Sequence, residues 1–271
     1  MHERVQYIKA IAGAMKGEIS SGIDSRLRSL NLFEYEQARR IVDLGTRGIE
    51  VEPIPPSLEE GKSAILVSNY PISVVETTRA VLKVGCRLPG EKPRFKAIGR
   101  KEVVTEAGLL LKVLGIDEIV FPVQKDESGV YRLESRRAYE EILSYLEEPG
   151  HVIWLSITGE TRGNGLLEED LRTGAVTFSL RRQVPIVPMG IVTKEKRRKA
   201  KVVRVRFGEP ISLPDTKDLS DFETGDFLID YSRLAMCQIA RLLPAGQRGS
   251  FEDVEEKLGE IYTRLRTYSR A

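Results

Sequence analysis

The stretch Ser63–Pro71, SAILVSNYP, decides the fold class, because an unbroken apolar run ends there in a polar turn. A second run of this kind is Val152–Gly165 (VIWLSITGETRGNG), and a third, VPIVPMGI, begins at Val184. Apolar runs of about four to eight residues bounded by turns are typical of buried strands in a parallel sheet. The polar turns would then lie at the carboxyl ends of strands, where open α/β sheets bind ligands.

Strands and helices alternate along most of the remaining chain. The pattern predicts a short strand in 49–53 and further strands at 64–67, 95–98, 119–123, 152–155, 186–191 and 202–207. It predicts helices at 74–84, 105–114, 131–146, 173–182, 226–243 and 251–268. This alternation indicates an α/β fold, with a mostly parallel central sheet flanked by helices. The short basic loop between the last two strands favours an antiparallel hairpin at one edge.

The beginning of the chain has a different pattern. Apolar residues recur every three or four positions from Glu3 to Ile19, which predicts an amphipathic helix. A second helix is expected from a cap at Asn31 to about Val42. We therefore expect an N-terminal helical segment over 1–47 and one α/β domain over 48–271. The apolar stripes can pack on that domain or lie in a membrane interface, and the sequence leaves both open.

Composition excludes several classes of function. Lys and Arg outnumber Asp and Glu by only 42 to 40, so no global charge would attract nucleic acid. Cys86 and Cys237 lack the spacing of a zinc site or a disulfide framework, and we expect neither metal nor cofactor. No window approaches the roughly 18 consecutive apolar residues of a membrane span. A cytoplasmic protein is expected, with peripheral contact to the inner face of the membrane as the alternative.

The three apolar runs resemble the glycerolipid acyltransferases typified by lysophosphatidic acid acyltransferase. Members carry Asn-His-x-x-x-x-Asp after a hydrophobic strand, where this chain has NYPISVV at 69–75. They carry Phe-Pro-Glu-Gly-Thr-Arg after a later strand, where this chain has ITGETR at 157–162. The Val-Pro-Ile-Val-Pro box is intact at 184–188, and VRVRFGEPISL from Val203 and IARLLPAGQRG from Ile239 are supporting matches. The resemblance covers about residues 48–249.

The resemblance implies roles for several residues. It places the phosphate of an anionic acceptor against Arg162 and the turn before it, and an acyl chain against an apolar wall at the third box. The implied substrate-binding residues are Asn69, Gly159, Thr161, Arg162, Val184, Pro185 and Pro188. Lys125 is either a second phosphate ligand, as a point charge, or a solvated loop lysine.

The catalytic positions of the first motif depart from the family pattern. The family histidine takes a proton from the acceptor hydroxyl and the aspartate orients the histidine, but this chain has Tyr70 and Val75 in their places. His151 precedes its strand and should lie at the opposite end of the sheet. The candidate catalytic residues are therefore Tyr70, as a hydrogen-bond donor to the thioester, and Glu76 or Glu160 as the base.

Three interpretations fit this degenerate active site. The first is an acyltransferase with a rebuilt site, which transfers an acyl group from acyl-CoA or acyl carrier protein to a lysophospholipid or glycerophosphate-like acceptor. The second is a catalytically inactive homologue that binds phospholipid or acyl carrier. The third is another reaction on a similar lipid or polyprenyl substrate. The first has the support of family prevalence, and the sequence leaves the other two open.

One basic run lies outside these motifs. The segment Lys194–Lys201, KEKRRKAK, forms the predicted hairpin tip and carries six basic residues. Such a run is either a solvated tip or a contact for anionic lipid headgroups, coenzyme A phosphates or an acidic acyl carrier protein. It lacks the interleaved aromatic residues of a nucleic-acid groove.

Overall fold

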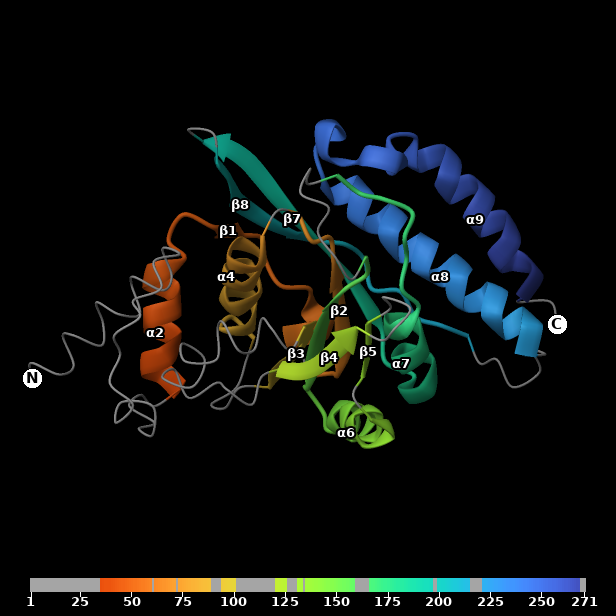
Figure 1. The fold of residues 1–271 in the computed structure, drawn as a ribbon, viewed down its shortest axis with the longest axis horizontal. Helices are drawn as coiled ribbons and strands as arrows, with labels where there is room; N and C mark the ends of the chain where they lie inside the picture. Colours follow the sequence, from red (N-terminus) through yellow and green to blue (C-terminus); the bar gives the residue numbers. More distant parts are fainter. Residues whose placement is uncertain are drawn as a thin grey trace, which may run out of the picture.

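The computed structural model describes residues 35–59, 61–71, 73–88, 94–100, 120–125, 131–133, 135–158, 166–196, 199–214 and 221–268. Within these residues an eight-stranded sheet lies at the centre, with helices on both faces (Figure 1). The strand order is β1-β8-β7-β2-β6-β3-β4-β5. The mostly parallel α/β fold predicted from the alternating pattern is therefore confirmed.

The strands are β1 (Glu50–Val51), β2 (Ala64–Ser68), β3 (Phe95–Arg100), β4 (Val120–Lys125), β5 (Tyr131–Leu133), β6 (Val152–Ser156), β7 (Ile186–Lys196) and β8 (Lys199–Phe207). The α-helices are α2 (Tyr35–Gly45), α3 (Pro56–Glu59), α4 (Val74–Gly85), α6 (Arg136–Glu147), α7 (Gly174–Arg182), α8 (Asp221–Leu242) and α9 (Val254–Tyr268). Two short 3₁₀ turns, η3 (Ala245–Gln247) and η4 (Gly249–Phe251), join α8 to α9.

The central strands run parallel. β2 pairs with β6 on one side and with β7 on the other, and β3 pairs with β6 and β4. All five residues of β2 are buried, as expected of a strand covered on both faces. β7 and β8 form the predicted antiparallel hairpin. The hairpin is not at the edge, however, because β1 pairs in parallel with the outer side of β8.

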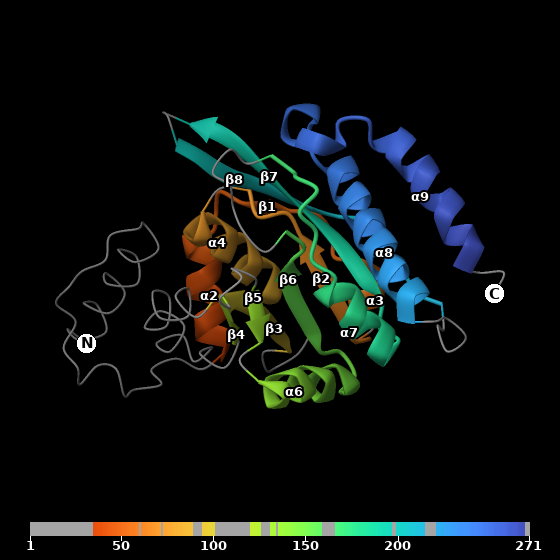
Figure 2. The same ribbon diagram turned by 45° about the vertical axis from the view of Figure 1, so that its right-hand side comes forward.

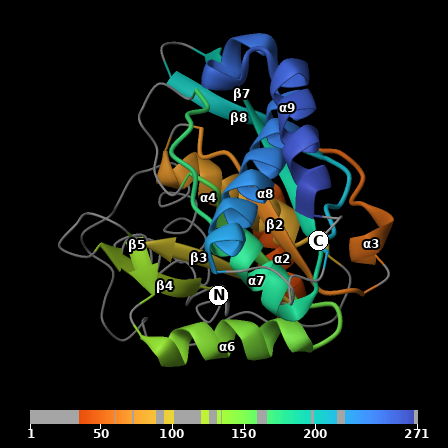
Figure 3. The same ribbon diagram turned by 90° about the vertical axis from the view of Figure 1, so that its right-hand side faces the viewer.

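Two apolar clusters cover the two faces of the sheet. One contains the buried side of α4 and Val42 of α2, together with Trp154 and Met189. The other collects the apolar sides of α6, α7, α8 and α9. Figures 1 and 2 show α2 and α4 on one side of the sheet and α8 on the other. Figure 3 shows α9 alongside α8, as the outermost helix of that face.

Gly190 sets how closely α8 approaches the sheet. A Cβ atom at this position would lie 2.6 Å from Cβ of Leu242, a separation that real Cβ atoms do not show. α8 can therefore pack on β7 at this distance only because the residue lacks a side chain. This contact brings the end of α8, and η3 after it, next to β7.

α2 packs against the rest of the described structure. Val42 is fully buried, and Asp43 forms an ion pair with the buried Lys83 of α4. Nε of Arg39 donates to the carbonyl of Cys86 at 2.8 Å. The boundary near residue 48 stays a prediction, and the predicted helix at 3–19 and the Asn31 cap lie outside the described residues.

The prediction of one helix over 131–146 was wrong at its beginning. Tyr131–Leu133 forms β5, which pairs antiparallel with β4. The helix begins at Arg136, because the side chain of Ser135 accepts a hydrogen bond from the backbone N–H of Ala138 at 3.2 Å and caps the first turn. The strand is only three residues long, so its alternation is too short to be distinguished from the beginning of a helix by periodicity alone.

Other predicted elements differ only at their ends. α8 begins at Asp221 rather than near 226, and α9 begins at Val254 because Phe251 belongs to η4. The predicted helix at 105–114 lies outside the described residues. In the part of the chain that the structure describes, no helix is long and apolar enough to cross a membrane.

Candidate functional site

The first two polar turns meet at one edge of the sheet. β2 and β6 are in parallel register, with Ser68 opposite Ser156. Directly beyond this pair, the backbone N–H of Ile157 donates to the carbonyl of Ser68 at 3.2 Å. Segments almost ninety residues apart in sequence are thus hydrogen-bonded neighbours at the carboxyl ends of their strands. We refer to this place as the site edge.

Asn69 is buried at the site edge, and its amide binds backbone. Nδ2 donates to the carbonyl of Ile191 at 3.0 Å, and Oδ1 accepts from the N–H of Ile191 at 2.8 Å. β2 pairs with β7 only as far as Ser68 opposite Met189, so Ile191, which pairs with Val205 of β8 on its other side, has no strand partner on the β2 side. The Asn69 side chain takes the place of the missing strand residue and satisfies both groups. Asn69 therefore fixes β7 beside β2, while its predicted contact with substrate stays a prediction.

Ser68 and Trp154 extend this buried network. Nε1 of Trp154 donates to Oγ of Ser68 at 2.9 Å, and Oγ of Ser68 donates to the carbonyl of Asn69 at 2.9 Å. Both side chains are buried, so each bond satisfies a polar group that water does not reach. The network joins β6 to β2 and holds the backbone that leads into Tyr70.

Tyr70 follows this rigid segment. Its side chain is half-buried and packs against the apolar cluster on the α4 face. Pro71 after it is buried, and Ser73 caps α4 by accepting a hydrogen bond from the N–H of Glu76 at 3.3 Å. Tyr70 therefore lies in the short connection between the end of β2 and the beginning of α4.

Glu76 has partners at both carboxylate oxygens. Oε1 pairs with Nη1 of Arg79 at 2.6 Å, and Oε2 accepts from the backbone N–H of Val202 at 3.1 Å. Nη2 of Arg79 in turn donates to the carbonyl of Gly45 at 2.8 Å. Glu76 thus ties α4 to β8 and, through Arg79, to the end of α2. Its predicted role as a base stays untested, and the geometry gives it a structural one.

The second polar turn leaves the described residues soon after β6. Oγ1 of Thr158 lies 3.2 Å from Oγ of Ser156, and the chain is described again from Leu166. Gly159, Glu160, Thr161 and Arg162 lie outside the described residues, so their predicted roles stay predictions.

The other predicted binding residues are not all at the site edge. Val184 and Pro185 precede β7, and Ile186 pairs with Ile65 near the beginning of β2, so this part of the third box lies at the amino end of the sheet. Pro188 is buried within β7, opposite Val67. Lys125 ends β4 at the same edge as Ser68, but three strands away, roughly 14 Å across the sheet.

His151 lies where the sequence places it. It precedes β6, and its carbonyl accepts from the N–H of Ala64, the first residue of β2. Its ring stacks on Tyr145, with centroids 4.1 Å apart. The prediction that this histidine lies at the amino end of the sheet is confirmed, so it cannot reach the site edge.

Arg172 is a residue of the site edge that the motif comparison missed. Its backbone N–H donates to the carbonyl of Ile157 at 2.9 Å, so it lies directly beside the beginning of the second polar turn. About a third of its side chain is exposed, and Nη2 lies 3.4 Å from a carboxylate oxygen of Asp170. Nε is buried and has no hydrogen-bond partner among the described residues. The sequence signal that could have located Arg172 is the segment DLRTG at 170–174, where the predicted helix begins.

The beginning of α7 adds to the positive potential at Arg172. Thr173 is its N-cap but makes no side-chain cap hydrogen bond, and the first turn contains no acidic residue. The amino end of a helix carries a partial positive charge and free N–H groups, which favour an anion. Guanidinium and helix end together make this side of the edge suited to a phosphate or carboxylate.

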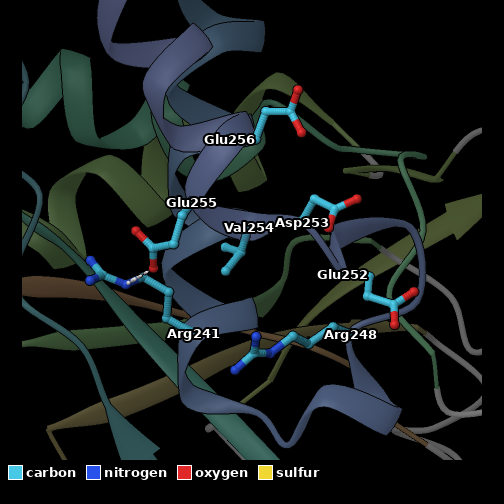
Figure 4. A pocket seen from close by; sticks show the side chains of 7 residues that line it. All are labelled: Arg241, Arg248, Glu252, Asp253, Val254, Glu255 and Glu256. Carbon is cyan, nitrogen blue, oxygen red and sulfur yellow. Dashed lines mark ion pairs between the residues drawn. The ribbon is translucent and has the colours of Figure 1, made fainter.

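Two cavities lie away from the site edge. One, of about 390 Å³, opens where α8 gives way to α9 (Figure 4). Its lining includes Arg248 and four acidic residues, Glu252, Asp253, Glu255 and Glu256, and Glu255 pairs with Arg241 at 3.1 Å. A second, of about 220 Å³, lies between α8 and α9. The acidic lining of the first does not suit a phosphate. Among the described residues, no group of three His, Cys, Asp or Glu side chains could hold a metal ion.

The largest pKa shifts among the described residues also lie in the α8 and α9 layer. Burial and the neighbouring Asp230 carboxylate raise the pKa of Tyr268 to about 12. Burial raises the pKa of the Cys237 thiol to about 11, so this cysteine stays a neutral thiol at physiological pH.

By sequence, no protein family and no curated protein matches the chain. By structure, it is similar to the crystal structure of the 1-acyl-sn-glycerophosphate (LPA) acyltransferase PlsC from Thermotoga maritima, with a TM-score of 0.48 and 13% sequence identity. The match covers 74% of this chain and 78% of that chain. A similarity of this degree assigns neither activity nor ligand to this chain.

Proposed function

We propose that this protein is acyltransferase-like and binds a phosphate-bearing glycerolipid acceptor at the site edge. In this proposal the acceptor is a lysophospholipid or a related glycerophosphate, and the acyl donor is acyl-CoA or acyl carrier protein. The observation that carries the proposal is the hydrogen bond between Ile157 N–H and the Ser68 carbonyl. It joins the two polar turns that the family resemblance links to acyl transfer and to phosphate binding.

Arg172 supports the same ligand class independently of the motifs. Its backbone is hydrogen-bonded to Ile157, where the turn that leads to Arg162 begins, and α7 begins two residues after it. Two guanidinium groups can bind the non-bridging oxygens of one phosphate, each with paired N–H donors. We propose that Arg172 and Arg162 hold the acceptor's phosphate together, with the Thr161 turn supplying backbone N–H groups.

The proposed reaction needs a base for the acceptor hydroxyl. The hydroxyl oxygen attacks the thioester carbonyl carbon, the new ester C–O bond forms, and the C–S bond breaks. Tyr70 donates a hydrogen bond to the carbonyl oxygen as it gains negative charge. Glu160 accepts the hydroxyl proton and returns it to the departing sulfur, which leaves as a thiol. We assign this role to Glu160 because both oxygens of Glu76 already have partners.

Binding without acyl transfer is the second candidate. The engagement of Glu76 with Arg79 and Val202 favours it, because it removes one of the two carboxylates that could replace the missing histidine. Under this candidate the site edge holds the phosphate of a lipid, and the protein acts as a lipid-binding homologue.

A thioester-release assay separates the two candidates. Acyl-CoA or acyl carrier protein is mixed with lysophosphatidic acid, and free thiol and acylated lipid are measured together with equilibrium binding of the lipid. Acyl transfer predicts both products. Binding of the lipid with no product selects the second candidate, and absence of both binding and product overturns the proposal.

Variants assign the roles within the site edge. Tyr70→Phe and Glu160→Gln should each lower turnover at least about tenfold, as expected for loss of a positioned donor or base. Arg172→Ala should weaken lipid binding at least about tenfold, whereas Arg181→Ala near the other end of α7 is the matched control and should not. If Glu76→Gln lowers turnover and Glu160→Gln does not, the base is Glu76.

A further inference from the structure

The outer end of the β7 and β8 hairpin extends beyond the rest of the sheet. On the β2 side, β7 is paired with β2 as far as Met189, then with the Asn69 side chain at Ile191. The Gln247 side chain takes the next position, because its amide binds both N–H and carbonyl of Thr193. After Thr193 the strand pairs only with β8 within the described residues. Figures 1 and 2 show this end reaching past the other strands. We call Lys194–Lys201 the arm.

The register of the arm places like charges opposite one another. Lys194 pairs with Lys201, and Lys196 pairs with Lys199. Directly opposite like charges destabilise an antiparallel pair, and residues two apart on a strand share a face. These two register positions therefore share one face of the arm, where the exposed Lys194 and Lys201 are directly opposite each other. The arm has one acidic residue, Glu195, and Arg197 and Arg198 lie outside the described residues.

The arginines on the inner part of the same face form ion pairs, whereas the described lysine side chains of the arm do not. Arg204 pairs with Glu50 of β1 at 2.7 Å, and Arg206 pairs with Glu52, the residue after β1, at 3.0 Å. Lys194 and Lys201 are exposed and have no ion-pair partner among the described residues. Among the described residues, the hairpin thus changes from ion-paired arginines to exposed lysines without an ion-pair partner where it leaves the body of the domain.

We propose that the arm is an electrostatic docking surface for an anionic lipid headgroup layer. Charge complementarity selects this partner over an acidic carrier protein. A protein interface has an apolar core rich in aromatic residues, and Ala200 is the single apolar residue between Lys194 and Lys201. A headgroup layer needs only clustered Lys and Arg. A protruding arm can also reach a flat surface without contact from the rest of the domain.

The position of the arm connects it to the site edge. β7 runs parallel to β2 and continues past the end of β2, so the arm leaves the sheet on the side where Asn69 lies. Lys194 follows Ile191 by three residues, which is roughly 10 Å along a strand. An arm bound to headgroups would hold the site edge near the lipid surface. The docking itself does not depend on acyl transfer and is tested separately from it.

Vesicle sedimentation with the full chain tests this docking. Binding is measured on phosphatidylcholine vesicles and on vesicles that also contain phosphatidylglycerol, at low and high salt. We expect binding to the anionic vesicles that weakens with salt. The double variant Lys194→Gln, Lys201→Gln should lower the partition coefficient about tenfold or more. The control Arg136→Gln, Arg137→Gln removes the same charge from exposed positions on α6 and should bind like the parent chain.

Three results overturn the proposal. They are absence of binding to anionic vesicles, equal binding to neutral and anionic vesicles, and equal binding of the lysine double variant and its control. In the third case, a loss of affinity of the lysine variant for an acidic acyl carrier protein would identify the carrier as the partner. Circular dichroism and the urea midpoint of each variant establish that the fold is retained.

Discussion

Asn69 and Gln247 bind the same edge of β7 two residues apart, each with one amide that donates to a carbonyl and accepts from an N–H. Asn69 binds Ile191 at 3.0 and 2.8 Å, and Gln247 binds Thr193 at 2.6 and 3.2 Å. The two clamps differ in surroundings, because Asn69 is buried inside the sheet and Gln247 is half-buried in η3. The same hydrogen-bond geometry therefore occurs in two environments that differ in access to water.

This difference shows that the pattern of hydrogen bonds does not by itself set their contribution to stability. A buried backbone group that loses its partner keeps the full cost of having left water. A group near the surface can bind water instead. Asn69 should therefore matter far more to the folded state than Gln247, although the two make equivalent contacts. The hydrogen bond from Tyr268 of α9 to Asp230 of α8 is likewise only part-buried, unlike the bonds of Asn69 at the site edge.

The largest effect is expected for Asn69→Ala. We expect the free energy of unfolding to fall by about 3 kcal/mol, because two buried groups of Ile191 lose their partner at about 1–3 kcal/mol each. Gln247→Ala is the matched control and should lower it by about 1 kcal/mol or less, because water can reach Thr193. Urea unfolding of both variants is the measurement. Equal losses would show that burial does not distinguish the two clamps.

A smaller effect is expected for Trp154→Phe, which removes the bond from Nε1 to Ser68 but leaves every backbone group paired. We expect a loss of about 1–2 kcal/mol in the free energy of unfolding, from the lost hydrogen bond and a small cavity. Ser68→Ala removes the same bond without shrinking the indole and separates the two terms. If Trp154→Phe destabilises more than Asn69→Ala, unpaired backbone is not the dominant cost at this edge.

Glu76→Gln should have a similar or slightly smaller effect on stability. Its carboxylate binds the backbone N–H of Val202 and the Arg79 guanidinium, and the amide can keep only one of these as an acceptor. We expect a loss of about 1 kcal/mol, measured by urea unfolding. Arg79→Ala should give a comparable loss if the pair acts as one structural unit. A stability unchanged by Glu76→Gln would free this carboxylate for the base role.

The smallest effect is expected in the α8 and α9 layer, as a dependence on pH. The phenol of Tyr268 donates to Asp230 at 3.2 Å, and its pKa is raised from 10.0 to about 12 by burial and by that carboxylate. The folded state therefore holds this proton more tightly than the unfolded state. The stability from this bond is fully present below pH 10 and is lost as the pH rises toward 12.

Tyr268→Phe tests this dependence. The variant should be less stable than the parent chain below pH 10, and the difference should disappear as the pH approaches 12. Unfolding midpoints of the two chains across this range are the measurement. A difference that stays constant with pH would contradict the assigned ionisation.

The sequence located the β-strand cores well, because an apolar run between turns reports burial directly. β2 and β6 agree with their predicted ranges to within one residue, whereas β5 was assigned to a helix. That error has a physical cause: Tyr131 and Leu133 alternate with Arg132, but three residues are too few to distinguish a strand from the beginning of a helix, and only pairing with β4 separates them. Periodicity reports which residues are apolar, and it does not report which partner covers them.

The candidate site divides in the same way. The sequence located Tyr70 and the two polar turns, because motifs are local. The sequence predicted that Asn69 binds substrate, and it gave no role to Arg172. Asn69 binds the distant Ile191 and Arg172 binds Ile157 of another loop, and a local motif reports neither contact. Asn69 and Ile191 are 122 residues apart, and their contact depends on β7 extending beyond the end of β2 in the sheet. Val184 and Pro185 were grouped with the site by motif, and strand direction places them at the other end.

By itself, then, the sequence determined the α/β class, the order of the central strands along the chain and the polar turns that follow two of them. These follow from local apolar pattern and turn chemistry. Only the tertiary structure decided that β1 pairs with β8, that the side-chain amides of Asn69 and Gln247 bind the edge of β7 beyond β2, and that Lys194 and Lys201 are exposed without an ion-pair partner among the described residues. Those features depend on strand order and register, which are set by packing between segments distant in sequence.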